Sequence, residues 1–377
     1  MKPRELVEQF PHTILAFRGY NVANLGRTPE LLQHPAYSPI VIAALTEASK
    51  IAGEILGRQV DLVNHVREKK KTDLDSYADD VTMIVAVELA QLRLLQECFQ
   101  IDYRSAKLSM GYSLGEISAL IAGGVVTMEH ALVPPLKLAA DCVDLAAEVS
   151  MGVLFSREGS VALDEVEQLC QEINCAGNGV IGISALLSPN SLLLLGQQNT
   201  VECFKKRMKE QLSCPVYLRK NDSHWPPLHS PIVWQRSIPN RSAEMLHTMP
   251  AEFKRPSPPI LSLVSGDVGY TETNVRAMLH RWCDHPQRLW DGVYQSLAMG
   301  VKTIVHVGPQ PNIIPATFKR LHDNVEAQTR GSIGMRALSV AISRPWLKAL
   351  LPARTALMNA PNVQHVILED WLLEQTV

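Results

Sequence analysis

Gly111-Tyr112-Ser113-Leu114-Gly115-Glu116 is the stretch that decides the fold. It follows a short apolar run at 106–110 and precedes a run with helical spacing at 116–122. Gly-x-Ser-x-Gly between a strand and a helix is the pattern of a nucleophile elbow, in which the serine has a strained backbone. Its hydroxyl then stands at a helix N-terminus, where free N–H groups favour a developing negative charge. We therefore predict that Ser113 is the nucleophile of an acyl transfer.

The composition is that of an ordinary globular protein. Of 377 residues, 46% are hydrophobic and 20% are charged, which predicts a large core and excludes a disordered chain. The formal net charge of −2 creates no field that would attract nucleic acid or anionic lipid. No apolar run reaches the roughly 20 residues of a membrane span. We therefore expect no nucleic-acid partner and no membrane span.

The cysteines and the short motifs restrict the chemistry further. The seven cysteines are odd in number and lack Cys-x-x-Cys spacing, and the N-terminus lacks the apolar segment of a signal peptide. Reduced thiols and a cytoplasmic location are the expectation. No metal-ligand spacing and no Gly-x-x-x-x-Gly-Lys is present, so we predict no metal and no bound cofactor.

The segments around the elbow predict an α/β lobe. Apolar runs predict buried strands at 12–17, 106–110, 260–264 and 303–307. Helical spacing predicts helices at 39–56, 81–96, 116–122, 128–147 (interrupted at Pro134-Pro135), 273–282, 290–299 and 313–321. The charged stretch 66–78, which contains Lys69-Lys70-Lys71, is expected to be exposed.

Residues 151–220 predict a separate unit. Strands at 153–155, 180–186, 192–196 and 216–218 alternate with helices at 163–173 and 200–212. This β-α-β-β-α-β order is the ferredoxin-like unit. We predict an α/β fold with a larger, α/β-hydrolase-like lobe around a parallel core sheet (1–147 and 221–325) and an inserted ferredoxin-like subdomain (148–220). The C-terminal extension, 326–377, packs on the core, on a second subunit or on a partner through its apolar residues Trp346, Leu350, Leu351, Ile367, Leu368, Trp371 and Leu372.

A serine nucleophile needs a base, and His229 is the first candidate. Prolines flank it in Trp225-Pro226-Pro227-Leu228-His229-Ser230-Pro231, which favours a rigid loop. It also directly follows the inserted unit, where the two lobes meet, and clefts between lobes are common ligand sites. A loop histidine with a purely structural hydrogen bond is the alternative, and His224 is a rival base.

The motifs together resemble the malonyl-CoA:acyl-carrier-protein transacylases and the acyltransferase domains of polyketide and fatty-acid synthases. The elbow is similar to their Gly-His-Ser-x-Gly-Glu, and residues 228–231 to their Phe-His-Ser-Pro. Asp284-His285-Pro286-Gln287-Arg288-Leu289-Trp290 is similar to their Asn-Pro-Val-Arg-Trp with one extra residue. Val307-Gly308-Pro309 and Lys319-Arg320 complete the order, so the resemblance covers residues 12–322.

The resemblance implies a two-step reaction through an acyl-enzyme. Ser113, activated by His229, takes an acyl group from acyl-CoA, and the phosphopantetheine thiol of an acyl carrier protein then accepts it. The backbone N–H groups of Leu114 and of Tyr20, which stands where the family has glutamine, are the expected oxyanion hole. A backbone carbonyl orients the histidine in this family, and residues 262–265 are the candidates. The remaining substrate-binding candidates are Gly19, Tyr112, Glu116 and Leu228.

One departure concerns the acyl group itself. Malonyl-specific members carry an arginine 25 residues after the serine, which pairs with the free carboxylate. That place is Leu138 here, with Lys137 beside it as a possible substitute after a register shift. A carboxylate facing leucine would be buried without a partner, at a cost of several kcal/mol. The sequence therefore favours an uncharged acyl group, acetyl or longer, over malonyl.

Three other functions remain open at this point. A hydrolase that removes acyl groups from carrier thioesters would use the same Ser113 and His229 with water. A non-catalytic docking module would keep the fold alone. An α/β-hydrolase esterase would place its acid between the serine and the histidine, where the inserted unit lies. The basic run at 205–209 is either a docking site for an acidic carrier protein or a solvated helix face.

Overall fold

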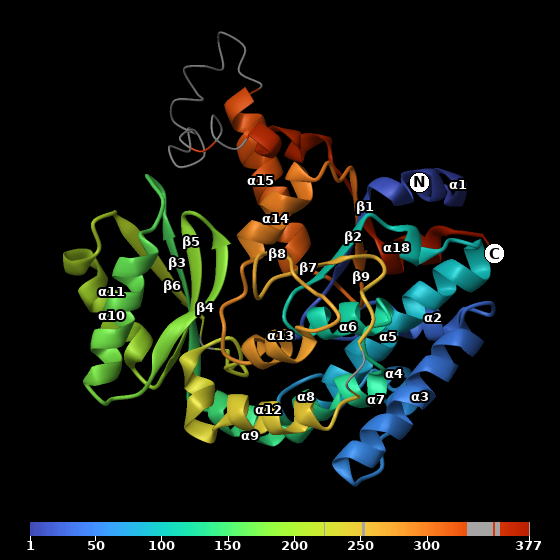
Figure 1. Ribbon diagram of the computed structural model, residues 1–377, viewed down its shortest axis with the longest axis horizontal. Helices are drawn as coiled ribbons and strands as arrows, with labels where there is room; N and C mark the ends of the chain where they lie inside the picture. Colours follow the sequence, from blue (N-terminus) through green and yellow to red (C-terminus); the bar gives the residue numbers. More distant parts are fainter. Residues whose placement is uncertain (222, 251–252, 330–349, 351–354, 377) are drawn as a thin grey trace.

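The computed structural model describes residues 1–221, 223–250, 253–329, 350 and 355–376. Two lobes lie side by side in it (Figure 1), a larger one around a six-stranded sheet and a smaller one around a four-stranded sheet. None of the helices in these described ranges is long and apolar enough to cross a membrane. The seven cysteines are all unpaired.

The sheet of the larger lobe has the strand order β10-β9-β1-β2-β7-β8. The strands are β1 (Thr13–Phe17), β2 (Leu108–Gly111), β7 (Ile260–Ser262), β8 (Asp267–Val268), β9 (Thr303–Val307) and β10 (Gln364–Ile367). Neighbours pair in parallel, except that β8 runs antiparallel to β7. β1 is central, and every one of its residues is buried. This confirms the predicted parallel core sheet.

The two faces of this sheet bury different side chains. Leu15 and Phe17 of β1 pack into the cluster formed with α3 (Ser38–Leu56), α5 (Tyr77–Phe99) and α6 (Leu114–Ala122). Ile14 and Ala16 point the other way, into the cluster formed with α14 (Leu289–Ala298) and α15 (Ile313–Thr329). Because successive strand residues face opposite sides, a continuous apolar run is what a sheet covered on both faces requires.

The helices of the larger lobe occur in three stretches of chain. The first holds α1 (Pro3–Gln9), η1 (Phe10–His12), α2 (Thr28–Gln33), α3 (Ser38–Leu56), α4 (Leu62–Arg67), α5 (Tyr77–Phe99) and η2 (Tyr103–Ser105). The second holds α6 (Leu114–Ala122), α7 (Met128–Ala131), α8 (Val133–Lys137) and α9 (Ala139–Ala146). The third holds η3 (Pro231–Arg236), α12 (Ile238–His247), α13 (Val275–Trp282), α14 (Leu289–Ala298), α15 (Ile313–Thr329), η4 (Thr355–Asn362) and α18 (Leu368–Glu374).

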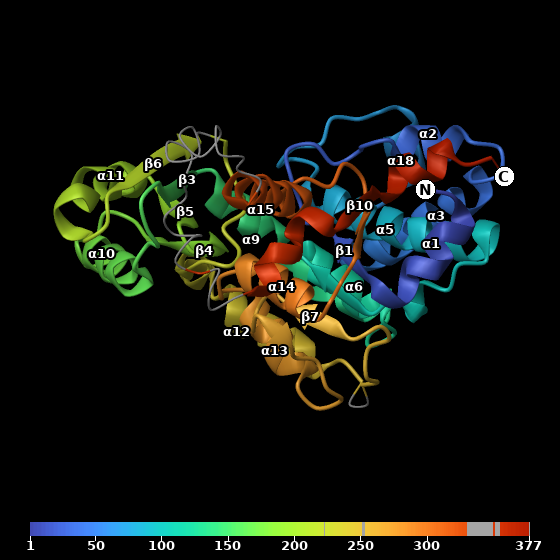
Figure 2. The same cartoon turned by 90° about the horizontal axis from the view of Figure 1, so that it is seen from above.

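The smaller lobe has the predicted β-α-β-β-α-β order. It consists of β3 (Val149–Ser156), α10 (Leu163–Cys175), β4 (Ile181–Ser188), β5 (Ser191–Gln197), α11 (Thr200–Gln211) and β6 (Val216–Asn221). The antiparallel strand order β4-β5-β3-β6 is the ferredoxin-like arrangement. Both helices cover the outer face of the sheet, and its inner face turns toward the larger lobe (Figures 1 and 2).

The C-terminal extension contributes to the core of the larger lobe. β10 pairs with β9, and the following α18 buries Leu368 and Leu372. Trp371 packs edge-on against Phe99 at 5.0 Å, and its Nε1 donates to the Met1 carbonyl oxygen at 2.8 Å. Three packing surfaces were expected for the tail: the core, a second subunit or a partner. Residues 355–376 pack on the core. Trp346 and Leu351 lie outside the described residues.

Some predicted boundaries differ from the structure for physical reasons. Stretch 66–78 was expected to be exposed, and Lys69-Lys70-Lys71 are exposed, but Tyr77 is buried because α5 begins there and carries its ring into the core. The helix at 128–147 is split into α7, α8 and α9, with Pro134 in the first turn of α8. That position tolerates proline because its N–H would have no helical partner.

We predict that the tail is required for the stability of the larger lobe. Trp371→Ala should lower the free energy of unfolding by about 3–5 kcal/mol, because it leaves a cavity between α18 and α5. Met358→Ala, a truncation in the same tail at a residue 41% exposed, is the matched control and should change it little. Urea denaturation of the three proteins measures the difference, and equal midpoints would contradict the packing described.

Candidate active site

The elbow at Ser113 has the backbone that its glycines predict. Ser113 links β2 to α6 with φ 55° and ψ −115°, a conformation that side chains rarely adopt. A Cβ at Gly111 would lie 2.0 Å from the Gly115 carbonyl carbon, and one at Gly115 would lie 2.4 Å from the Phe17 carbonyl oxygen. The elbow therefore packs backbone on backbone, against β1, and the serine projects beyond the end of β2.

His229 lies next to this serine. Its Nε2 is 2.7 Å from Ser113 Oγ, although the residues are 116 positions apart. His229 has φ 65°, and its backbone N–H donates to the Cys283 carbonyl at 2.8 Å. Trp282 Nε1 donates to the Ser113 carbonyl oxygen at 2.9 Å. The last residue of α13 and the residue after it thus fix the two members of the pair.

The environment of His229 keeps its imidazole neutral. Burial lowers its pKa to about 4, while the backbone carbonyls of Trp282 and His285 oppose this by stabilising the protonated ring. The backbone carbonyls that affect the ring thus belong to Trp282 and His285, whereas the orienting carbonyl was expected from residues 262–265. A neutral imidazole in contact with a hydroxyl can accept its proton.

Gln287 completes the contacts of the pair, and the sequence analysis did not assign it. Its side chain is fully buried. Oε1 accepts from the Ser113 backbone N–H at 2.9 Å, and Nε2 lies 3.2 Å from His229 Nδ1. Residues 284–290 resemble a family motif but contain one extra residue. This departure is the signal in the sequence that pointed to the position of Gln287.

Ser113 and His229 face a cavity of about 350 Å³ between the lobes. The larger lobe contributes the predicted Gly19, Tyr20, Tyr112 and Leu228 as well as Asn21, Tyr77, Trp225, Pro226, Asn312, Ile313 and Ala316. The smaller lobe contributes Met151, Val153, Ser184, Leu187, Leu193 and Leu195 from the inner face of its sheet. Tyr20 packs edge-on against Tyr77 at 4.8 Å and Trp225 at 6.4 Å. Among the described residues that line the cavity, none is a carboxylate, a lysine or an arginine.

The two predicted oxyanion donors belong to segments next to the nucleophile. Leu114 is the first residue of α6, where N–H groups have no partner within the helix. Tyr20 follows β1 and Gly19, where a Cβ would lie 2.7 Å from the Tyr112 carbonyl oxygen. Buried Arg18 holds this loop, since its guanidinium donates to the Gly19 carbonyl oxygen at 2.7 Å and to Asn24 Oδ1 at 2.7 Å.

Glu116, a predicted substrate-binding residue, is not among the residues that line the cavity. It is fully buried beneath the elbow, where it accepts from Ser262 Oγ, from Tyr270 Oη at 2.8 Å and from the Leu263 N–H at 3.2 Å. Burial raises its pKa to about 7, against these donors. Its position supports a structural role that joins α6 to β7.

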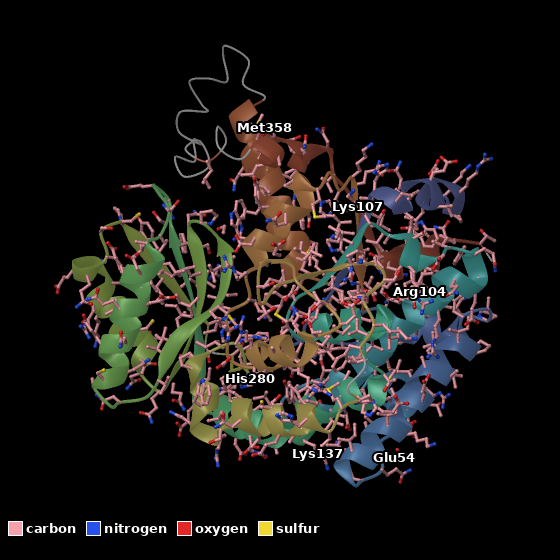
Figure 3. All side chains as sticks on the ribbon, viewed as in Figure 1. Glu54, Arg104, Lys107, Lys137, His280 and Met358 are labelled. Atoms are coloured by element: carbon pink, nitrogen blue, oxygen red, sulfur yellow. The ribbon has the colours of Figure 1, made fainter. Side chains whose placement is uncertain are left out.

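The predicted clamp residues also lie outside the cavity. Leu138 is 3% exposed in the apolar core. Lys137 is exposed on the rim of the molecule (Figure 3) and lines a different cavity, of about 530 Å³. Tyr77 borders both cavities. The register of α8 therefore does not direct Lys137 toward Ser113.

The other candidates have structural partners. His224 Nδ1 lies 3.3 Å from the Val149 carbonyl oxygen, so it is not beside Ser113. Arg288 Nε donates to Asp291 at 2.6 Å. In the basic run on α11, Arg207 pairs with Glu172.

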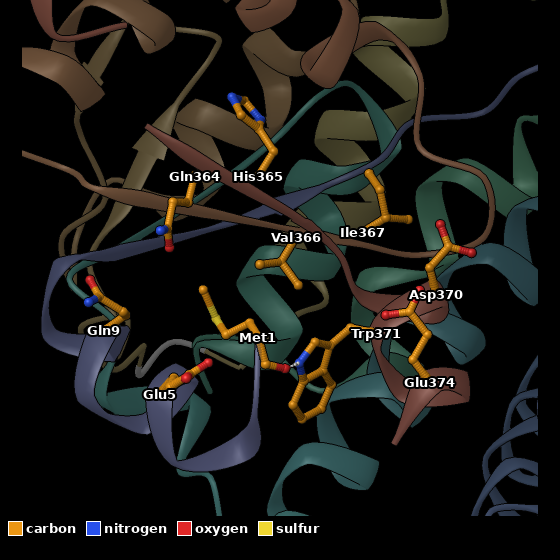
Figure 4. Close-up of a pocket in the computed structure, with 10 residues that line it drawn as sticks. All are labelled: Met1, Glu5, Gln9, Gln364, His365, Val366, Ile367, Asp370, Trp371 and Glu374. Carbon is orange, nitrogen blue, oxygen red and sulfur yellow. Dashed lines mark hydrogen bonds between the residues drawn. The ribbon is translucent and has the colours of Figure 1, made fainter. Parts of the chain in front are cut away.

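A larger cavity, of about 730 Å³, lies elsewhere (Figure 4). It is bordered by α1, β10 and α18 and lined by acidic Glu5, Asp370 and Glu374. No nucleophile with a base partner lines it. Within the part of the chain that the structure describes, no group of three His, Cys, Asp or Glu side chains could hold a metal ion.

The chain is similar to proteins of the kind that the motifs indicated. No family model matches it. It is 22% identical over 262 residues to a malonyl CoA-acyl carrier protein transacylase of Bacillus subtilis, which covers 69% of the chain. The match spans 62% of that relative's length, slightly less than two thirds.

Solved structures share the fold. The acyltransferase domain from module 8 of the salinomycin polyketide synthase has a TM-score of 0.66 at 16% identity, over 96% of this chain and 72% of that one. A malonyl-transacylase solved in complex with its type II polyketide synthase acyl-carrier protein has a TM-score of 0.62 at 20% identity, over 82% and 92%. The predicted fold class, a larger α/β lobe with an inserted ferredoxin-like subdomain, is confirmed.

Because the pKa of His229 is low, we predict that Ser113 remains reactive down to a low pH. Because the imidazole is neutral above a pH of about 4, labelling of Ser113 by a fluorophosphonate should be independent of pH from 8 to 5.5 and should decrease only below. Intact-protein mass after brief exposure at each pH measures it, with Ser113→Ala as the unlabelled control. A midpoint at 6.5 or above would contradict the buried, neutral base.

Proposed function

We propose that this protein is an acyltransferase that moves an acyl group from acyl-CoA, through an ester on Ser113, to the phosphopantetheine thiol of an acyl carrier protein. The observation that carries the proposal is the 2.7 Å contact between His229 Nε2 and Ser113 Oγ at a strained elbow facing an apolar cavity. Some of the similar proteins belong to polyketide synthases, and we propose fatty-acid or polyketide-type biosynthesis as the setting here. A cytoplasmic location accompanies the proposal, as the cysteine pattern predicts.

The first half-reaction forms the acyl-enzyme. Ser113 Oγ attacks the thioester carbonyl carbon while its proton passes to His229 Nε2, and the carbonyl oxygen becomes an oxyanion. The N–H groups of Leu114 and Tyr20 are the donors proposed for that oxyanion. The carbon–sulfur bond then breaks, and the imidazolium returns its proton to the CoA thiolate.

The second half-reaction uses the same groups in reverse. The carrier thiol gives its proton to His229 as its sulfur attacks the Ser113 ester, and the imidazolium then protonates the departing Ser113 Oγ. One solved relative is a carrier protein in complex with its malonyl-transacylase, which supports a carrier as the acceptor here. The reaction is a transfer between thioesters, so no cofactor takes part in the balance.

We further propose that the acyl group is uncharged. The cavity lining offers mostly apolar and aromatic side chains, and Lys137 lines a different cavity, which Tyr77 also borders. A malonyl carboxylate in this cavity would lose its hydration without gaining a cation, at a cost of several kcal/mol. Acetyl or longer alkyl groups have no such cost and gain burial against Leu195, Met151 and Trp225.

The competing functions differ in what they require of this site. The close Ser113–His229 contact disfavours a docking module that has lost its chemistry. Within the described residues, no carboxylate hydrogen-bonds His229, which disfavours an esterase of the Ser-His-Asp type. A hydrolase would need water to attack the ester in the apolar cavity, and it is tested directly below.

Transfer and hydrolysis are distinguished by the fate of the acyl-enzyme. When acetyl-Ser113 protein is mixed with holo carrier protein, we expect the acetyl group on the carrier thiol, with discharge at least about tenfold faster than in buffer alone. Mass spectrometry of both proteins measures this, and Ser113→Ala with acetyl-CoA is the control. Discharge that is equally fast without a carrier would identify a hydrolase instead.

Tyr77 is predicted to exclude charged acyl groups. Tyr77→Ala removes a side chain that borders both the acyl cavity and the cavity lined by Lys137, so the ratio of malonyl to acetyl ester on Ser113 should rise about tenfold or more. Tyr77→Phe keeps the ring and should leave the ratio unchanged. Adding Lys137→Met to the alanine variant should reverse the gain, and an unaltered ratio in Tyr77→Ala would contradict this account.

A further inference from the structure

One side-chain amide contacts both the nucleophile and the base. Gln287 is fully buried, with its Oε1 2.9 Å from the Ser113 backbone nitrogen and its Nε2 3.2 Å from His229 Nδ1. It is therefore a third member of the contact chain, beyond the two half-reactions described above. Neither of those half-reactions assigns it a task.

The orientation of this amide follows from its first partner. A backbone N–H only donates, so the group facing the Ser113 nitrogen must be the acceptor, Oε1. The other end, which faces His229 Nδ1, is then the NH₂ group, which only donates. Nδ1 can accept this hydrogen bond only when it carries no proton. The neutral imidazole then has its proton on Nε2, which is the nitrogen 2.7 Å from Ser113 Oγ.

A second set of groups favours the opposite tautomer. The backbone carbonyls of Trp282 and His285 favour the protonated form of the His229 ring. Because Nε2 contacts Ser113 Oγ, we take the proton that they favour to be the one on Nδ1. To act as a base, Nε2 must be unprotonated, so the proton of the neutral ring must be on Nδ1 when Ser113 attacks. The amide of Gln287 and these carbonyls therefore compete for the same proton.

The main chain of Gln287 connects this competition to the smaller lobe. Its N–H donates to the Ser184 carbonyl oxygen at 2.9 Å, and its carbonyl oxygen accepts from the Leu186 N–H at 2.9 Å. Together they form a parallel bridge opposite Ala185 of β4. Ser184 and Leu187 of the same strand line the cavity. A displacement of β4 by an acyl group would therefore be transmitted directly to the amide.

We propose that Gln287 is a positioning residue that holds the Ser113 backbone and selects which ring nitrogen of His229 carries the proton at rest. In the resting site the proton is on Nε2 and is donated to Ser113 Oγ. In the working site it is on Nδ1 and is donated to the carbonyls of Trp282 and His285. The exchange moves one proton between the two nitrogens of a neutral ring and consumes none. The role of this proton exchange in catalysis rests on the proposed function. The tautomer of the resting site does not depend on that function.

The groups around the ring are compatible with this reading. Tyr20, Tyr77 and Tyr112 line the same cavity, and burial raises the pKa of each phenol, so all three are neutral near pH 7. Burial also raises the pKa of the Cys283 thiol to about 11. Asp284, on the segment after α13, bonds to His285 Nδ1 at 2.7 Å and to Trp234 Nε1 at 3.0 Å. His229 thus has polar partners but no charged one among these groups.

The first test reads the tautomer directly and needs no acyl donor. In protein labelled with ¹⁵N-histidine, long-range ¹H–¹⁵N correlation at pH 7.5 reports which nitrogen of each ring is protonated. Comparison with His229→Ala assigns the signal. We expect the Nε2–H form in the wild type and the Nδ1–H form in Gln287→Glu, which keeps an acceptor for Ser113 and replaces the donor by a second acceptor. Nδ1–H in the resting wild type would overturn the proposal.

The second test separates positioning from a merely structural role. Labelling of Ser113 by a fluorophosphonate decreases below a limiting pH, which we call the acid limb. In Gln287→Glu this limiting pH should rise by about one unit or more, because a carboxylate beside the ring favours the imidazolium. Gln235→Glu is the matched control. Gln235 also bridges the lobes, at 2.7 Å from Gln197, but does not contact the pair, so its limb should not move. Slower labelling in Gln287→Glu with an unshifted limb would mean that Gln287 acts only through packing.

Discussion

The backbone of Ser113 is the constraint on which the rest of the site depends. Its positive φ is stable only because Gly111 and Gly115 let β2, α6 and the end of β1 approach without a Cβ between them. Strain of about 1–3 kcal/mol at one residue is tolerated when the surrounding structure fixes it from several sides. Here the Trp282 indole fixes the carbonyl and the Gln287 amide fixes the N–H of the same residue. These main-chain contacts therefore fix the position of Ser113 and leave its hydroxyl available to react.

Burial without charge gives the site its chemical character. His229 is held neutral by burial and is oriented by carbonyls and an amide, where many serine enzymes use a carboxylate. The acyl cavity follows the same pattern, because aromatic and aliphatic groups line it and none of its described lining residues carries a cation. The charged residues near the elbow do not line this cavity. Glu116 is buried under α6, and Arg18 is buried in the loop after β1. A neutral base and a neutral acyl group are thus consistent with one apolar environment.

The sequence predicted those features that are local. Runs of a few residues predicted the elbow, the strand β2 before it and the neighbouring strands β1 and β7. They also predicted the ferredoxin-like order of the small lobe, and all of these are confirmed. Short β10 was not predicted, since Gln364–Ile367 is a strand only because β9 offers it an edge. Gln287 was missed because its contacts join residues 174 and 58 positions apart. Glu116 was assigned to substrate from its place in a motif, whereas its partners on β7 and at Tyr270 bury it.

The central claim is that Ser113 carries an uncharged acyl group because the cavity cannot hold a carboxylate. Its most direct test is a competition in one tube, in which the protein meets equal concentrations of malonyl-CoA and butyryl-CoA for a single turnover. The mass of the ester on Ser113 is then read before discharge. The account predicts butyryl-enzyme in at least about tenfold excess, since an unpaired buried carboxylate costs more than the 1.4 kcal/mol that corresponds to a factor of ten. A majority of malonyl-enzyme would contradict it.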